Sequence, residues 1–348
     1  MITLLNDDFS ALNEFLTEKS FSKIFILVDE NTHDYCLPIV LGNLQTEIPM
    51  EILEVEAGEE MKNIQTANHL WEILTEMKAD RKALLINLGG GVITDMGGFV
   101  ASTYKRGIRF INIPTTLLSM CDASIGGKTG IDLMHYKNMV GTFCFPEQIF
   151  VFTDFLKTLP YKELRSGFAE MLKHGLIADQ LHWEELIKIH KIDAESVFPY
   201  IKASMDIKEE IVKVDCYEKN VRKTLNFGHT IGHAIESLFL EKENPVLHGE
   251  AVAIGMICET YLSYLENLIS EEDCQKVIDG IRKYYPDVDI SDFTNSSIIN
   301  LLLNDKKNTD NRINFSLLSG VGTSVFDHEC MTENITATLD FYRKLSDF

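Results

Sequence analysis

The sequence predicts an α/β protein, with a Rossmann-like parallel-sheet domain over residues 1–155 and a mainly α-helical domain over 156–348. Two observations support this fold class. Before about residue 115, short β-branched runs alternate with helical stretches, which predicts parallel strands at 24–28, 51–55, 83–88 and 110–113. Beyond about residue 155 the apolar period becomes 3.6, which predicts helices over 161–177, 197–214, 227–240 and 250–265, with a small hairpin over 313–322.

The composition is that of a globular protein with two cores. A chain of 348 residues is long enough for two domains. A net charge of −21 argues against nucleic acid or an anionic membrane as a partner, because neither is bound without a basic face. The N-terminus lacks a secretory signal and seven scattered cysteines suit reduced thiols, so we expect a cytoplasmic protein that spans no membrane.

The segments that follow the predicted strands are candidate ligand-binding segments, because parallel sheets bind ligands at the carboxyl ends of their strands. The third strand is followed by Gly89-Gly90-Gly91, where backbone amides at a helix N-terminus can approach a pyrophosphate. Asp95 could then accept from a ribose hydroxyl. The spacing is not Gly-x-Gly-x-x-Gly, so a plain turn between strand and helix remains open.

A second glycine segment, Gly126-Gly127-Lys128-Thr129, is similar to the end of a P-loop. Asp122 stands where that motif begins with glycine, and its carboxylate would repel phosphates, so we reject a P-loop. What remains is a lysine and an aspartate on a glycine-bearing loop. They suit the binding of an acidic substrate or a dinucleotide, and a solvated surface loop is the alternative.

A third pattern points to a metal. His229 and His233 lie four residues apart on a predicted helix and therefore share a face. His248 follows fifteen residues later, and Glu170 lies upstream. Nitrogen and carboxylate ligands suit catalytic zinc, which keeps three protein ligands and one open position. Spacing alone allows both His229 and His233 to be ligands, and for this pair alone two ordinary buried histidines are an equally open interpretation.

The cations of this acidic chain lie in or beside these segments. A small, highly anionic substrate in one cationic pocket would explain the arrangement, although for any single one of them a solvated surface position is the better interpretation. They are Lys105, Arg106, Lys128, Lys137, Lys173, Lys208, Arg222, Lys306 and Lys307.

Together these segments resemble the 3-dehydroquinate synthase family, the NAD-dependent sugar phosphate cyclases of the shikimate pathway. The resemblance covers nearly the whole chain. It is carried by residues 89–92 with Asp95, by 114–118, 122–130, 137–138 and 167–173, and by 222–236 with His248-Gly249-Glu250.

The resemblance implies zinc, with cobalt as a possible substitute, bound by Glu170, His229 and His248. His233 would then lie beside the substrate. It implies NAD bound by Asp29, Asn31, Glu59, Lys62, Gly90, Gly91, Val92, Asp95, Thr115, Thr116, Lys137, Thr158, Leu159 and Glu163. It implies catalytic or substrate contacts from Asp122, Lys128, Asn138, Lys173, Lys208, Glu218, Arg222, Asn226, His233 and either Lys306 or Lys307, with Arg106 reaching across a homodimer interface.

The implied activity is a lyase reaction of aromatic amino-acid biosynthesis. It converts 3-deoxy-D-arabino-heptulosonate 7-phosphate to 3-dehydroquinate and phosphate by transient oxidation with NAD, phosphate elimination, re-reduction and aldol cyclisation. Three alternatives remain: another sugar phosphate cyclase, a metal-dependent polyol or glycerol-type dehydrogenase, and a noncatalytic metal-binding protein. The chain departs from the family pattern at Asp132, Cys216 and Asn220, and we expect Asn220 to preserve a left-handed turn that glycine usually makes.

Overall fold

The computed structural model describes residues 2–134, 136–240, 242, 245–303 and 313–346. The chain divides into two compact units. Unit 1 comprises Met1–Pro160 with Asp193–Phe198, and unit 2 comprises Tyr161–Ile192 with Pro199–Phe348. The assignment of NAD to residues 1–155 and of metal and substrate to 156–348 stays a prediction.

Unit 1 is built on a six-stranded parallel sheet, as the sequence predicts. Its strands run in the order β1-β8-β5-β4-β2-β3, and every pair is parallel. They are β1 (Ile2–Leu4), β2 (Ile24–Asp29), β3 (Met50–Val55), β4 (Leu84–Gly89), β5 (Arg109–Pro114) and β8 (Ile149–Val151). The four predicted strands are confirmed, whereas the three-residue strands β1 and β8 are too short to show a periodicity.

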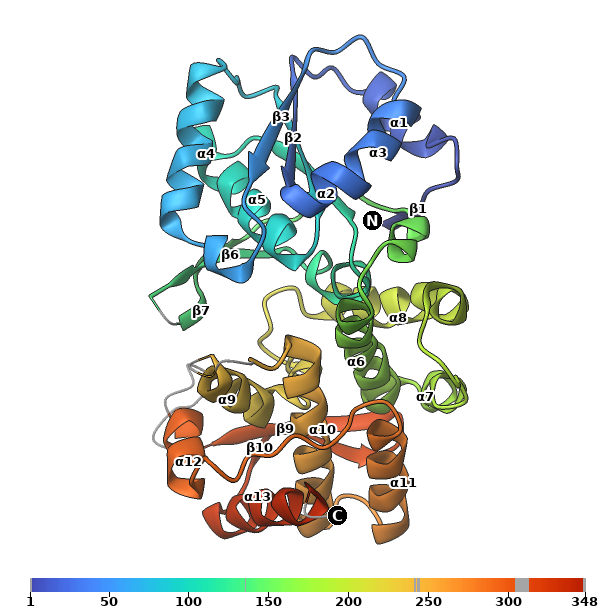
Figure 1. Cartoon of the computed structure of the whole chain (residues 1–348), viewed down its shortest axis with the longest axis vertical. Coiled ribbons are helices and arrows are strands. Elements are labelled where there is room, and N and C mark those ends of the chain that lie inside the picture. Colours follow the sequence, from blue (N-terminus) through green and yellow to red (C-terminus); the bar gives the residue numbers. More distant parts are fainter. Residues whose placement is uncertain (1, 135, 241, 243–244, 304–312, 347–348) are drawn as a thin grey trace. The chain divides into compact units, whose positions relative to one another are not determined.

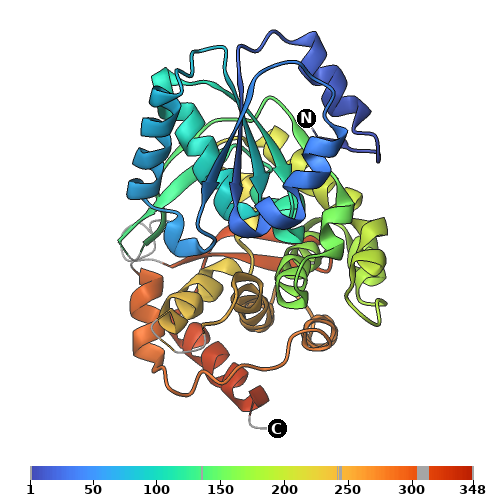
Figure 2. The ribbon, with the colours of Figure 1, turned by 45° about the horizontal axis from the view of Figure 1, so that its top comes forward.

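Helices cover both faces of this sheet, with α4 and α5 on one face and α1 and α3 on the other (Figures 1 and 2). One core joins buried side chains of β2, β3, β4, α4, α5 and the strand β6. The remaining elements of unit 1 include α1 (Ser10–Glu18), α2 (Glu30–Tyr35), α3 (Leu37–Asn43), η1 (Glu59–Met61), α4 (Ile64–Glu76), α5 (Gly91–Thr103), η2 (Tyr104–Arg106), η3 (Ser119–Ala123), β6 (Lys128–Leu133), β7 (Tyr136–Phe143) and η4 (Thr153–Lys157).

The central strands explain the continuous apolar runs of the sequence. Residues 24–28 of β2 and 84–88 of β4 are wholly buried, as strands covered on both faces must be. From β2 the chain continues outward to β3 and then returns to the other side of β2 as β4. The strand order therefore reverses between β2 and β4, and ligands of such sheets bind where it does so.

Unit 2 is mainly helical, and α10 is buried along most of its length. The predicted helices are confirmed as α6 (Tyr161–Ala178), α8 (Ala194–Val214), α9 (His229–Phe239) and α10 (His248–Leu265). The others are α7 (Gln180–Leu186), η5 (Val221–Asn226), α11 (Glu271–Arg282), α12 (Asn295–Leu303) and α13 (Thr332–Ser346).

The hairpin of unit 2 is longer than predicted. Its strands are β9 (Asn314–Gly320) and β10 (Thr323–Glu329), paired antiparallel. The expected range 313–322 holds only β9 and the turn. The prediction missed β10 because it is mixed in polarity and only partly buried, so it lacks a clear apolar alternation.

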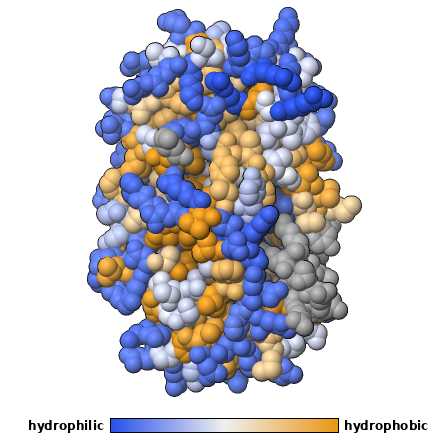
Figure 3. Space-filling view, turned by 180° about the vertical axis from the view of Figure 1, so that it is seen from behind, coloured by the Kyte–Doolittle hydropathy of each residue, from blue (hydrophilic) through white to orange (hydrophobic). Residues whose placement is uncertain are grey.

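Hydrophobic and hydrophilic residues are mixed over the face of the molecule drawn in Figure 3. Within the described part of the chain, no helix combines the length and the apolar character that a bilayer crossing requires.

The close packing of α5 on β4 gives a prediction for Gly97→Ala. A Cβ at Gly97 would lie 2.0 Å from Oδ1 of Asn87, whose buried amide donates to Asn112 at 2.9 Å. We expect a loss of about 1–3 kcal/mol in the free energy of unfolding, measured by urea denaturation. The matched control is Gly42→Ala in α3, where no atom lies within 4 Å and alanine should be neutral or stabilising. Equal stabilities of the two variants would contradict this explanation of the packing.

Candidate active site

Several of the predicted NAD residues of unit 1 lie at the carboxyl ends of neighbouring strands. Asp29 ends β2 and caps α2, because its Oδ1 accepts from the backbone N of Thr32 at 2.8 Å. Gly90, after β4, is the N-cap residue of α5. The end of β5 is tied to the end of β4, since the N of Thr115 donates to the O of Gly89 at 3.0 Å. Three adjacent strands therefore present their carboxyl ends together.

Gly90 has little room for a side chain. A Cβ there would lie 3.1 Å from Cγ2 of Thr116. The segment from Gly90 to Val92 opens α5 and includes the first amides of that helix, which have no partner within it. The predicted pyrophosphate site is thus a helix N-terminus at the strand-order reversal of the sheet.

Lys62 organises a second group of predicted residues in unit 1. Its buried Nζ lies 2.7 Å from Oδ2 of Asp95 and 2.7 Å from Oδ1 of Asn138. Burial lowers the pKa of Lys62, but Asp95 and Glu59 outweigh it and the pKa is raised, so the lysine is charged. Lys137 lies 3.7 Å from Glu59. Four predicted NAD residues and one predicted substrate residue are therefore one cluster.

Asp132, where the chain departs from the family pattern, has a structural role beside this cluster. Its carboxylate accepts from the backbone N of Asn138 at 2.7 Å, and its own N donates to the O of Lys62 at 2.7 Å. Asn138 has a positive φ of 54°, which this hydrogen bond helps to hold. Asp132 thus fixes the backbone that presents Asn138.

Other predicted residues of unit 1 lie outside this cluster. The expectation of one loop carrying Asp122 and Lys128 is wrong, because Asp122 lies in η3 and the exposed Lys128 is the first residue of β6.

Arg106 is exposed at the end of η2, with a φ of 66°. Thr158 and Leu159 follow η4, and Asn31 is in α2, whereas Glu163 belongs to α6 of unit 2. Lys306 and Lys307 lie outside the described residues.

In unit 2 the structure brings Glu170, His229 and His248 together. One ligand atom from each lies within 4.8 Å of the others. Nε2 of His229 is 3.3 Å from Oε1 of Glu170, and Nε2 of His248 is 3.6 Å from the same oxygen. The three residues come from α6, from the first position of α9 and from the first position of α10.

The second nitrogen of each ring has its own acceptor. Nδ1 of His229 is 3.1 Å from the O of Phe227, and Nδ1 of His248 is 3.4 Å from Oε2 of Glu236. These acceptors favour a proton on Nδ1 and leave Nε2 directed toward Glu170. A neutral ring that carries its proton on Nδ1 is the tautomer that binds a metal through Nε2.

Charges around Glu170 keep it ionised although it is wholly buried. Burial raises the pKa of this carboxyl, but the Lys173 ammonium, together with the contact to the His229 ring, outweighs burial and holds the pKa well below its usual value. Burial, and then Lys173, lower the pKa of His229, so that ring is neutral. Burial also lowers the pKa of His248, yet its contacts with Glu170 and Glu236 prevail and raise the pKa to about 10.

The three residues fit a zinc ion. Oε2 of Glu170 forms an ion pair with Lys173, whereas Oε1, the oxygen that both Nε2 atoms approach, has no well-aligned hydrogen bond to any described residue. That is unusual for a buried carboxylate oxygen. Two imidazole nitrogens and one carboxylate oxygen are a donor set of catalytic zinc, which leaves one position for a substrate. We call Glu170, His229 and His248 the metal group.

His233 lies beside the metal group. Its ring centroid is 5.1 Å from that of His229 and 5.9 Å from that of His248. His233, Glu236 and His248 also form a group with metal-ligand spacing, so the alternative of His233 as a ligand is open on geometry alone.

A further cluster of metal-binding residue types, Glu266, His328 and Cys330, has a simpler explanation. Oε1 of Glu266 accepts from Asn334 at 2.8 Å, and Oε2 lies 3.2 Å from Nε2 of His328. Burial raises the pKa of the Cys330 thiol, which disfavours the thiolate that a metal needs. Hydrogen bonding accounts for this cluster.

Predicted substrate residues in unit 2 form a polar network after α8. The carboxylate of Asp215 accepts from the backbone N of Lys219, Asn220 and Arg222 at 2.6–3.1 Å. The buried guanidinium of Arg222 donates to the O of Cys216 at 2.6 Å. This turn presents the predicted cation Arg222.

The expectation of a left-handed Asn220 is wrong. Its φ is −138°, and the residue with a positive φ is Glu218, at 56°. Nδ2 of Asn226 donates to Oε1 of Glu218 at 2.8 Å, which ties this strained residue to the end of η5. Lys173 and Lys208, two further predicted cations, are both buried.

The sequence reasoning assigned no role to Glu236 beside His248, and it missed Glu259. Glu236 lies seven residues after His229 on the same helix, so helical periodicity could have found it. Nothing local marks Glu259, because its contacts are to residues about 30 positions away.

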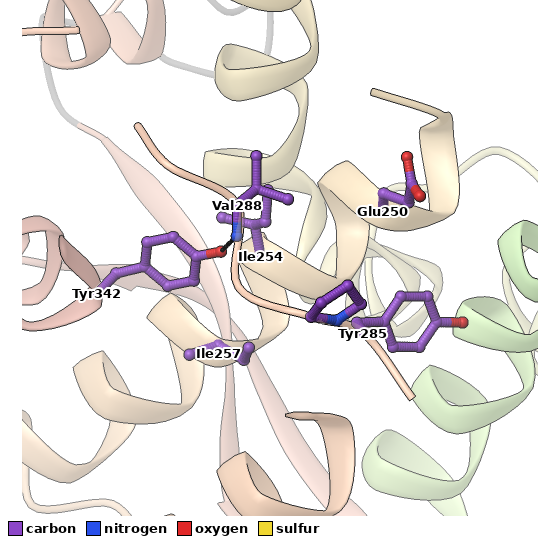
Figure 4. A pocket seen from close by; sticks show the side chains of 7 residues that line it. Glu250, Ile254, Ile257, Tyr285, Val288 and Tyr342 are labelled. Carbon is purple, nitrogen blue, oxygen red and sulfur yellow. Dashed lines mark hydrogen bonds between the residues drawn. The ribbon is translucent and has the colours of Figure 1, made fainter. Parts of the chain in front are cut away.

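The pocket in Figure 4 is separate from these groups. It is apolar and is lined by Glu250, Ile254, Ile257, Tyr285, Pro286, Val288 and Tyr342. The hydroxyl of Tyr342 accepts from the N of Val288 at 3.1 Å, and that of Tyr285 donates to the O of Arg165 at 2.5 Å. No residue of the metal group lines it.

Comparison with known proteins decides the family. The model of the 3-dehydroquinate synthase N-terminal domain matches residues 52–166, and that of the C-terminal domain matches 167–308. The chain belongs to the 3-dehydroquinate synthase family. A 3-dehydroquinate synthase from Parabacteroides distasonis is 42% identical over 347 residues, which cover 99% of this chain and 98% of that protein.

Solved structures support the same fold. A 2-deoxy-scyllo-inosose synthase complexed with carbaglucose-6-phosphate, NAD+ and Co2+ has a TM-score of 0.85 and 25% identity, covering 99% of this chain and 96% of that one. A 2-epi-5-epi-valiolone synthase from Streptomyces hygroscopicus, with NAD+ and Zn2+ bound, has a TM-score of 0.84 and 24% identity, covering 99% and 97%. The predicted fold class is confirmed.

The raised pKa of His248 predicts proton release when the metal group binds zinc. In the metal-free protein at pH 7 this ring carries a proton, since its pKa is raised to about 10, and zinc requires the neutral imidazole. Zinc binding should therefore release about one proton, and its affinity should fall as the pH falls below 10. Calorimetric titration in buffers of different ionisation enthalpy measures this release. A binding enthalpy that is the same in all buffers would contradict it.

Proposed function

We propose that this chain converts 3-deoxy-D-arabino-heptulosonate 7-phosphate to 3-dehydroquinate and phosphate, with zinc and NAD as cofactors. Family membership over nearly the whole chain supports the lyase reaction. The observation that carries the cofactor proposal is the metal group, a buried carboxylate and two histidines whose Nε2 atoms face it.

Glu170, His229 and His248 would hold zinc. When bound, zinc and NAD supply polarisation of the substrate hydroxyls and reversible hydride acceptance. The protein prepares the metal group to bind a cation, because Glu170 is kept ionised, His229 is kept neutral, and Glu236 orients His248.

Buried cations of unit 2 would bind the anionic groups of the substrate. Lys173, Lys208 and Arg222 are each at most 6% exposed. Lysine and arginine side chains donate charge-assisted hydrogen bonds to carboxylate and phosphate oxygens, so these cations suit a substrate that carries both groups. In unit 1 we assign substrate contacts to Asp122, Lys128 and Asn138, and to Arg106 across a homodimer interface.

Proton handling would fall to His233, with Glu218 and Asn226. His233 is half-buried one helical turn from His229, so it lies beside a substrate that reaches the metal. Asn226 holds Glu218 through the hydrogen bond at 2.8 Å. His233 would exchange protons with substrate oxygens, and Glu218 would complete the path through water.

NAD would bind at the strand ends of unit 1. The amides of Gly90, Gly91 and Val92, at the N-terminus of α5, would bind the pyrophosphate, and Asp95, which Lys62 holds, would accept from a ribose hydroxyl. The other proposed contacts are Asp29, Asn31, Glu59, Thr115, Thr116, Lys137, Thr158 and Leu159 in unit 1, and Glu163 in unit 2.

The reaction is tested by product analysis. With the heptulosonate, zinc and a trace of NAD, we expect release of one mole of phosphate per mole of carbocycle and no accumulation of NADH. A colorimetric phosphate assay, absorbance at the nicotinamide band and mass spectrometry measure the three quantities. NADH formed mole for mole with product would refute cofactor recycling. Turnover of plain polyols would favour a dehydrogenase, and a different carbocycle would favour another cyclase.

The division of labour between the two helix-spaced histidines is tested by a matched pair. His229→Ala should lose both zinc and activity, because it removes a ligand. His233→Ala should keep zinc and lower kcat by about 10²–10⁴-fold, the usual worth of a positioned acid or base. Zinc content by atomic emission and steady-state kinetics measure both effects. Equal zinc loss in the two variants would refute this assignment.

A further inference from the structure

We propose that Glu259 is a positioning residue for the metal group. It fixes the N-terminus of α9, where His229 is the first residue, and offsets the positive end of that helix. This inference rests on the proposed zinc-dependent function.

The side chain of Glu259 is wholly buried in α10 and accepts from two backbone amides of another helix. Oε2 accepts from the N of Gly228 at 2.5 Å, and Oε1 accepts from the N of Ile231 at 2.9 Å. Gly228 is the N-cap residue of α9, and Ile231 is its third residue. One carboxylate thus spans the first turn of the helix.

The sequence of α9 explains why this contact is needed. In a capping box, the N-cap side chain accepts from the third amide, and the side chain at the third position accepts from the N-cap amide. Gly228 has no side chain and Ile231 is apolar, so α9 can supply neither acceptor itself. Glu259 supplies both from a different helix.

Backbone packing makes the contact rigid. A Cβ at Gly255 would lie 1.8 Å from the O of Gly228, and one at Gly232 would lie 2.9 Å from the O of Ala251. The start of α9 therefore rests directly on the backbone of α10 and has no room to slide. Because α10 begins with His248, this packing sets the separation of the two histidine ligands.

The charge of Glu259 matters as well as its shape. The N-terminus of a helix carries about half a positive charge, which disfavours a dication bound at its first residue. A carboxylate on those amides cancels that repulsion. The N-terminus of α10 also has a carboxylate beside it, because Oε2 of Glu250 accepts from the N of Leu247 at 2.9 Å. Both helices that offer a histidine begin on a carboxylate.

The test is zinc affinity of the intact protein without substrate. We expect Glu259→Gln, which keeps size and one acceptor oxygen, to raise the Kd for zinc by about 10–100-fold. Glu259→Asp, which keeps the charge, should recover part of the loss. The matched control is Asp179→Asn, which removes a carboxylate that caps α7, a helix without a proposed ligand. It should lower Tm and leave the zinc Kd unchanged.

Competition with a chromophoric chelator gives the Kd, and the visible spectrum of the cobalt form reports ligand geometry. Unchanged zinc affinity in Glu259→Gln, or an equal loss in Asp179→Asn, would overturn the inference. Neither readout requires turnover. A wild-type protein that binds zinc and releases no phosphate would therefore contradict the proposed function. The zinc Kd values of the variants, compared with one another, would still decide the role of Glu259.

A second measurement uses only the wild-type protein, so it remains valid even if Glu259→Gln does not fold. Coupling between metal and helix end is reciprocal, so zinc should slow hydrogen exchange at the amides of Gly228 and Ile231. Rates at both amides that zinc does not change would overturn the inference.

Discussion

The buried carboxylate of Glu170 is the constraint on which the rest of unit 2 depends. An ionised group in the interior costs several kcal/mol unless opposite charges and donors surround it. Lys173 lies on the same helix, but His229 and His248 come from two others. The three helices must therefore pack so that residues from all of them surround one carboxylate.

Helix α10 holds α6 and α9 in place through different kinds of contact. Toward α6, the N of Gly249 donates to Oγ of Ser166 at 2.9 Å, and Arg165 forms an ion pair with Glu250. A Cβ at Gly249 would lie 2.1 Å from the O of Ser166, so only glycine permits this approach. Toward α9, glycines bring the backbones together and Glu259 bonds the helix end. The first residues of two helices thus become neighbours of one residue on a third.

The predicted NAD residues of unit 1 are positioned mainly by local backbone structure. Parallel strand ends and a helix that begins with glycine expose backbone amides, the feature that the predicted dinucleotide site requires. Contacts between distant residues add to this, since the buried ammonium of Lys62 ties Asp95 and Asn138 together and Lys137 pairs with Glu59. The glycine turn and the strand ends are local features, so the predicted NAD segments are visible in the sequence as motifs, whereas the network around the metal group is visible only in part.

The sequence by itself determined the parallel sheet, the long helices and which polar segments follow which strands, because apolar period and glycine placement act over a few residues. It also placed His229 and His233 on one face of a helix and offered His248 and Glu170 as further ligands, and resemblance to a family then favoured His229 over His233 as the ligand. The tertiary structure alone decided the three-residue strands, the approach of Glu170, His229 and His248 to one another, and the contact of Glu259 with the N-terminus of α9. These features arise from contacts between residues far apart in the chain, and such contacts exist only once the helices have packed.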